Sequence, residues 1–357
     1  MANLGFFVRA TLGCVVLTAA CSAGGGDGQG ATSNEESESG GEPTSATSSG
    51  SAGPGSESGD ASDADTGSTT GAGDDVQVVP LRIDAFSVPT IETYYACFEF
   101  SFSLDQLGHI VGFRPHIDDT KHVHHYVLSK LDEPTGQQDG YSCFDLSGEM
   151  IYTWAPGGTD WMLPPEAGFL IGDAPGGTAT LRLQVHYNNV AGDTGFTDSS
   201  GLDLLVSKTL REHNAGTMVF GDIEGIQIPA GMAAYEHVAT CRGGATSTLL
   251  SEPMHIFGTA MHAHELGRVL WSEVWRDGAI SYELNRDEPY LFDSQHMNPV
   301  DLVVEPGDEV RTHCIYDSTA RVDTTIGGPG TGDEMCWNVV TYWPRVNQPI
   351  DQCGTGN

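Results

Sequence analysis

The residues of this chain best suited to chemistry are two histidines and a methionine: His262, His264 and Met335. Residues i and i+2 of an extended strand point to the same face, so His262 and His264 can present two imidazoles to one metal ion. The thioether of Met335 is a soft ligand, unusual for zinc, magnesium or calcium and suited to copper that cycles through Cu(I). The three residues therefore predict a catalytic copper site.

A second group of histidines lies in the first half of the chain: His124, His125 and His186. Neighbouring residues on a flat strand face opposite sides. His124 and His125 can therefore reach one metal only if the strand bends or if the two rings bind through different nitrogens. Two sites with three ligands each, one all-imidazole and one with a thioether, indicate copper redox chemistry.

The remaining histidines have weaker claims to a metal. His122 also stands two residues from His124 and is an alternative ligand, and we interpret His255 as structural. Gln184 shares a strand face with His186, where it either supports the first site or is an ordinary polar residue of the strand. No spacing argument applies to the others, which we interpret as surface or structural residues: His109, His116, His213, His237, His296 and His313.

Short strands must position these groups, because the folded part of the sequence has an all-β pattern. Runs rich in Val, Ile, Leu, Tyr and Thr alternate with turn residues, and no helical period extends over twelve or more residues. Folded residues from 78 onward are better divided between two sandwiches than packed in one. We place the break near residues 211–216 and predict domains at 78–212, with the first histidine group, and 213–357, with the second.

The N-terminal residues indicate export. Residues 1–20 have one basic residue, a short apolar run and small residues before Cys21, which is typical of a bacterial signal peptide. We expect Cys21 to carry lipid and to anchor the protein to a membrane outside the cytoplasm. An ordinary signal peptide cut near Cys21 is the alternative. Residues 21–77 form a predicted disordered linker, rich in Gly and Ser, with acidic but no basic or aromatic residues after Cys21.

Charge and cysteine content agree with an exported protein. The formal net charge of −34 makes nucleic acid a poor partner and favours solubility. Apart from Cys14 and Cys21, six cysteines remain, an even number that indicates three disulfides in an oxidising compartment. Sequence alone leaves all pairings open among Cys97, Cys143, Cys241, Cys314, Cys336 and Cys353.

These motifs, in this order, resemble the copper type II ascorbate-dependent monooxygenases. The resemblance extends from Thr93 to Pro344 and rests on the following segments: 93–97, 123–125, 164–168, 183–187, 198–201, 255–257, 262–264, 267–268, 304–308 and 334–336. It implies two consecutive antiparallel jelly-roll β-sandwich domains that carry two copper ions, with ascorbate as the electron donor.

Residue by residue, the resemblance assigns an electron-supplying copper to His124, His125 and His186, the adjacent pair using different ring nitrogens. It assigns the copper that handles oxygen and substrate to His262, His264 and Met335. It also implies three disulfides: Cys97–Cys143, Cys241–Cys353 and Cys314–Cys336.

The substrate is predicted less closely than the reaction, which adds one atom of O2 to an activated C–H bond of a small molecule. Ala260, Trp337 and Val339 stand where peptide-amidating relatives have residues that hold the peptide. At Asn338 and Tyr342 the sequence follows the pattern of the catecholamine enzymes somewhat better than that of the peptide-amidating enzymes. We therefore expect an apolar or aromatic small molecule. The alternatives are a copper-binding or copper-storage lipoprotein without turnover, and a binding module whose metal sites have decayed.

Overall fold

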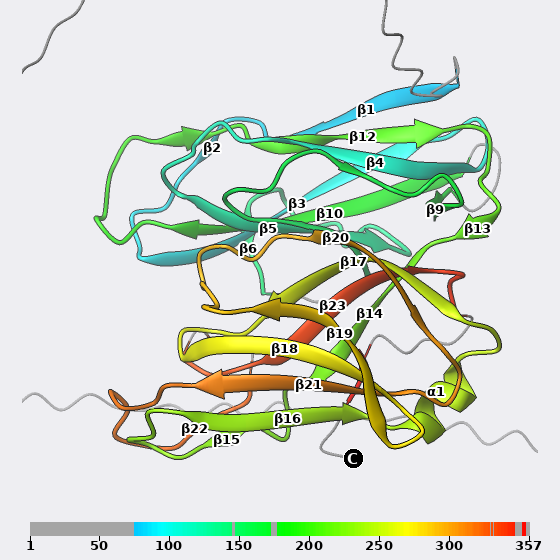
Figure 1. Ribbon diagram of the computed structural model, residues 1–357. Helices are drawn as coiled ribbons and strands as arrows, with labels where there is room; N and C mark the ends of the chain where they lie inside the picture. The colour runs from blue at the N-terminus through cyan, green and yellow to red at the C-terminus, as the bar shows by residue number, and fades with distance from the viewer. Residues whose placement is uncertain are drawn as a thin grey trace, which may run out of the picture. The chain divides into compact units, whose positions relative to one another are not determined.

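The computed structural model describes residues 75–144, 147–172, 177–328, 330, 332–346 and 352–354, which belong to one compact unit, Ser68–Asn357. Within these residues there are twenty-four strands and one short helix, α1(Gly243–Leu249), so the predicted all-β class is confirmed (Figure 1). None of the described helices is long and apolar enough to cross a membrane. The predicted signal peptide, Cys21 and nearly all of the predicted linker lie outside the described residues.

Strands before residue 215 form two large antiparallel sheets. One has the order β1-β12-β4-β9-β13, with β8 beside β4 and only the β13–β9 pair parallel, and the other has the order β6-β3-β10-β5-β7. β2 and β11 form a separate pair. The bounds are β1(Val76–Arg82), β2(Phe86–Ser87), β3(Thr93–Ser103), β4(Gly108–His116), β5(Val123–Leu131), β6(Tyr141–Ser142), β7(Glu149–Trp154), β8(Trp161–Met162), β9(Ala167–Ile171), β10(Thr178–Asn188), β11(Thr197–Asp198), β12(Gly201–Ser207) and β13(His213–Asn214).

Strands after residue 215 form a second pair of large sheets, ordered β20-β17-β23-β14-β24 and β16-β21-β18-β19, with β15 and β22 paired beside them. Every described strand pair joins two strands on the same side of residue 215. The boundary between two domains at residues 212 and 213 stays a prediction. The bounds are β14(Gly216–Asp222), β15(Gln227–Ile228), β16(Tyr235–Cys241), β17(Met254–His262), β18(Gly267–Arg276), β19(Ala279–Asp287), β20(Asn298–Val304), β21(Glu309–Tyr316), β22(Thr325–Ile326), β23(Cys336–Trp343) and β24(Gln352–Cys353).

The first strand begins slightly earlier than expected. Val76 and Gln77 were predicted to end the linker, but they lie in β1 and continue its antiparallel register, with Val76 opposite Ser207. A strand edge supplies backbone hydrogen bonds regardless of side-chain composition, so the pairing extends two residues into the polar segment.

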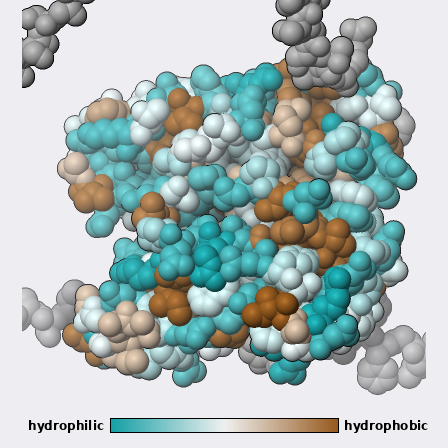
Figure 2. Space-filling view, viewed as in Figure 1, coloured by the Kyte–Doolittle hydropathy of each residue, from teal (hydrophilic) through white to brown (hydrophobic). Residues whose placement is uncertain are grey.

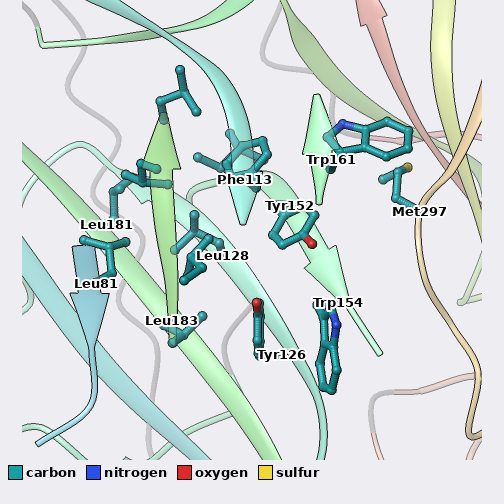
Figure 3. Close-up of a cluster of buried hydrophobic side chains, with 14 of the residues drawn as sticks. Leu81, Phe113, Tyr126, Leu128, Tyr152, Trp154, Trp161, Leu181, Leu183 and Met297 are labelled. Atoms are coloured by element: carbon teal, nitrogen blue, oxygen red, sulfur yellow. The ribbon is translucent and has the colours of Figure 1, made fainter. Parts of the chain in front are cut away.

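A large apolar core fills the space between the two main sheets of the first half. Leu81, Phe113, Leu128 and Leu181 contribute to it and are almost fully buried (Figure 3). On the surface shown in Figure 2, apolar side chains are scattered among hydrophilic ones, as expected when most large apolar residues are inside.

The same core extends across to the second half of the chain. Met297 lies beside Trp161 in Figure 3, and Phe257, Ala260 and Val339 belong to the same buried cluster. The sheet that contains β17 and β23 therefore packs one face against the first half, beside β5 and β7. This contact places the ends of β5, β10 and β17 in one neighbourhood.

Three disulfides join the described cysteines, and they are the three that the resemblance implied: Cys97–Cys143, Cys241–Cys353 and Cys314–Cys336. The last one ties β21 to the start of β23, directly after Met335.

Candidate metal centres and the pocket between them

The first histidine group comes together on the paired strands β5 and β10. His186 lies opposite His125, but the next pair is Tyr187 with Val123, so His124 is the extra residue of a β-bulge. A bulge bends the strand and re-aims a side chain, which lets two adjacent histidines turn to one side. One ligand atom from each of His124, His125 and His186 lies within 4.8 Å of the others.

The use of different ring nitrogens by His124 and His125 toward one metal stays a prediction. Their Nδ1 atoms are 2.9 Å apart and face each other, while Nε2 of His124 is hydrogen-bonded to Asp293. The bulge solves the geometric problem that a flat strand poses, whichever nitrogen of each ring faces the metal.

His186 is the strongest sign that this group holds a cation. Its side chain is 2% exposed, and neither ring nitrogen has a hydrogen-bond partner among the described residues. Burial, with the nearby ring of His124, lowers the pKa of His186 to about 3, so the neutral ring offers one unprotonated nitrogen to a metal. Buried polar atoms rarely lack a partner. Three imidazoles are a donor set that fits copper, and a bound ion would give the buried ring of His186 a partner.

The second group lies at the end of β17. The ring centroids of His262 and His264 are 5.2 Å apart, and the buried Met335 lines the same pocket as both rings. His264 donates from Nδ1 to the carbonyl oxygen of Asp333 over 3.0 Å, and His262 Nδ1 contacts Gln295 Oε1. In both rings Nδ1 is held by an oxygen atom, as is common for histidines that bind a metal through the other nitrogen.

Buried polar residues brace this second group. Glu334 is fully buried and accepts hydrogen bonds from the backbone N–H groups of His264 and Leu266, each over 2.7 Å. Burial raises its pKa to about 7. Tyr290 bonds both backbone groups of Ala263, and the Tyr316 hydroxyl donates to the carbonyl oxygen of Met335 over 2.7 Å. Sequence reasoning treated Glu334 only as part of a motif and missed both tyrosines.

One pocket lies between the two groups and is lined by His125 from the first and by His262, His264 and Met335 from the second. The groups are close enough to interact, since burial together with the surrounding histidines of both groups lowers the pKa of His125 well below its ordinary value. The rest of the lining is mostly apolar or aromatic, with Phe144, Trp154, Phe292 and Val339 among its members. No Asp, Glu, Lys or Arg is among the described residues that line it.

Three residues outside the two ligand groups also have clear positions. His122 is buried with Nδ1 2.6 Å from Asp119 Oδ2 and Nε2 3.2 Å from Asp193 Oδ2, so both its nitrogens are engaged by carboxylates. Gln184 lines the pocket on the same strand as His186. His255 stacks flat on Trp343, with ring centroids 3.9 Å apart.

Comparisons with known proteins agree with this arrangement. Two family models match, described as copper type II ascorbate-dependent monooxygenase, N-terminal domain, over residues 79–194, and C-terminal domain, over residues 213–355. The chain is 33% identical over 300 residues to a tyramine beta-hydroxylase of Caenorhabditis briggsae. The aligned segment covers 79% of this chain and 51% of that protein.

Two vertebrate proteins give similar figures. Identity is 30% over 299 residues with DBH-like monooxygenase protein 2 of Mus musculus, covering 79% of this chain and 48% of that protein. Identity is 31% over 291 residues with dopamine beta-hydroxylase of Equus caballus, covering 76% of this chain and 47% of that protein. The chain thus spans about half the length of the curated relatives it matches.

Proposed function

This chain belongs to the copper type II ascorbate-dependent monooxygenase family, and on that premise we propose that it hydroxylates an activated C–H bond of a small organic molecule. The co-substrates are O2 and a one-electron reductant such as ascorbate. The observation that carries the proposal is the pocket itself, because one histidine of the all-imidazole group, His125, and all three residues of the group with a thioether line it.

Each ligand group has its own role in this proposal. His124, His125 and His186 hold the ion that supplies an electron, and His262, His264 and Met335 hold the ion beside which oxygen and substrate meet. Copper, when bound, supplies one-electron chemistry and activates O2. The chain itself fixes the ligand positions, through the bulge at His124 and through Glu334, and surrounds the reacting centre with apolar side chains that exclude water.

The lining of the pocket favours an uncharged substrate. Tyramine and dopamine, for which two of the relatives are named, carry an amine, and a charged amine buried here would meet no carboxylate among the described lining residues. A carboxylate substrate would equally lack a cation. The indole N–H of Trp337 is buried without a hydrogen-bond partner among the described residues, and Trp337 lines the pocket. A neutral aromatic or apolar molecule with one acceptor oxygen matches these features.

We extend the proposal to fold and location. Each half would be a jelly roll, with the domains divided at residues 212 and 213, and the protein would be exported and held to a membrane by lipid on Cys21. The paired, mainly antiparallel sheets of each half, the three disulfides and the composition of residues 1–77 support these statements.

Oxygen uptake by copper-loaded protein with ascorbate tests the function. We expect 2-phenylethanol to be hydroxylated with kcat/KM at least about 10-fold above that of phenethylamine or hippurate, since burying an unpaired charge costs more than about 1.4 kcal/mol. Product oxygen should come from labelled O2. Protein that binds copper but shows no substrate-dependent oxygen uptake would instead support the storage alternative.

The variant Trp337→Phe sharpens this test. Removing one neutral hydrogen bond should lower kcat/KM for 2-phenylethanol about 2- to 10-fold. Ethylbenzene, which has the same ring and chain without the hydroxyl, serves as the matched control and should react equally well with both proteins. An equal loss for the two substrates would mean that Trp337 shapes the pocket and donates no hydrogen bond.

A further inference from the structure

One short loop contacts histidines of both metal groups. This bridging loop, residues 291–296, lies between β19 and β20 in the second half of the chain. Its Asp293 Oδ1 accepts a hydrogen bond from His124 Nε2 over 2.6 Å, and its Gln295 Oε1 contacts His262 Nδ1. We propose that Asp293 and Gln295 are positioning residues that hold the two metal sites together and give them unequal electron-donating strength.

The contact with the first site has several parts. The Phe292 ring lies 5.3 Å from the His124 ring, centroid to centroid, and the side chain of His124 is only 7% exposed. Asp293 itself is 80% exposed, and its only hydrogen bond among the described residues is to His124. Burial therefore does not force this carboxylate onto the imidazole. Pairing with His124 is what orients it.

The contact with the second site is fixed by the loop itself. Gln295 donates from Nε2 to the carbonyl oxygen of Phe292, which turns its Oε1 toward His262. The backbone N–H of Ser294 donates to the carbonyl oxygen of Leu291 over 3.0 Å, closing the loop as a turn. Since His124 and His262 lie on opposite halves of the chain, a displacement of this turn alters the support of both rings at once.

The partners of the ring nitrogens differ in charge between the sites. His124 has a carboxylate, whereas His262 has an amide oxygen and His264 a backbone carbonyl. A carboxylate on the outer nitrogen makes an imidazole a stronger donor to its metal than a neutral oxygen does. Stronger donation favours Cu(II) over Cu(I), so the site of His124 would give up its electron more readily. This inference rests on the proposed function and accounts for the direction of electron flow within it.

Copper titration and redox titration of full-length Asp293→Asn test the proposal without turnover. The substitution keeps the size of the side chain and removes its charge. We expect Cu(II) affinity at the first site to fall about 10- to 100-fold and the reduction potential of that site to rise, with the Cu(II) spectrum of the second site unchanged. Asp301→Asn, at another exposed acidic residue of the same half, is the matched control and should change neither value.

Gln295→Glu provides the reciprocal test. A carboxylate beside His262 should lower the reduction potential of the second site. The difference between the reduction potentials of the two metal sites should then become smaller. The inference is overturned if Asp293→Asn binds copper as the wild type does with an unshifted first-site potential, or if both sites shift equally. Wild-type protein that bound no copper would overturn the proposed function and this inference with it.

Discussion

Met335→Ile is expected to abolish hydroxylation while the protein stays folded. Isoleucine keeps the apolar bulk of the side chain, and volume-conserving swaps in a core usually cost less than about 1.5 kcal/mol. The substitution also removes the only sulfur ligand of the proposed second site. Changing a residue that merely supports a ligand costs up to about 100-fold in activity, so loss of the ligand itself should lower activity by at least about 100-fold. Oxygen uptake and product formation measure the first effect, and chemical denaturation measures the second.

The surroundings of Met335 explain why the fold should survive. Cys336 is bonded to Cys314, and the Tyr316 hydroxyl holds the backbone of Met335 itself. Met254→Ile is a matched control, because Met254 is equally buried but lies in the interior of the second half. It should keep full activity with a similar small loss of stability. Normal turnover by Met335→Ile would show that the second site is wrongly assigned.

Glu334→Ala should produce the largest loss of stability among the changes considered. It leaves the backbone N–H groups of His264 and Leu266 buried without acceptors, and each unsatisfied group costs about 1–3 kcal/mol. The free energy of unfolding should therefore fall by about 4 kcal/mol, and copper should be lost from the second site because His264 is no longer held. Denaturation curves and metal analysis give the two values.

A surface glutamate provides the comparison. Glu224 is exposed in the same half, so Glu224→Ala should leave stability and copper content unchanged. The bracing role of Glu334 would be wrong if the free energy of unfolding of Glu334→Ala lay within about 1 kcal/mol of the wild-type value and the variant bound both coppers.

The strand pattern of the sequence predicted much of the architecture. One run of β-forming residues, 180–187, lies within β10, where Leu181, Leu183 and Val185 belong to the core and His186 to the metal group. Such a run is a local property of the sequence and can be read directly. The disulfide pairs came only from the family resemblance, because spacing alone cannot choose among pairings.

Other features depend on contacts that no local pattern encodes. The bulge at His124 depends on the register between β5 and β10, and sequence reasoning could only name a bend as one of two solutions. Asp293 and Gln295 lie in a loop without a recognisable motif, and they reach the histidines only because the two halves pack together. The carboxylate of Glu334 gains its role from burial, which its neighbours in sequence do not reveal.

Copper content is the most direct measure of whether the chain has two separate ligand groups, on which the proposed function depends. Copper-loaded wild-type protein should hold about two equivalents, and His186→Ala and His262→Ala should hold about one each. The copper that remains should give a different Cu(II) spectrum in the two variants, one from each site. A single equivalent in the intact protein, zinc retained in preference to copper after Cu(I) loading, or loss of the same equivalent in both variants would contradict two independent copper sites.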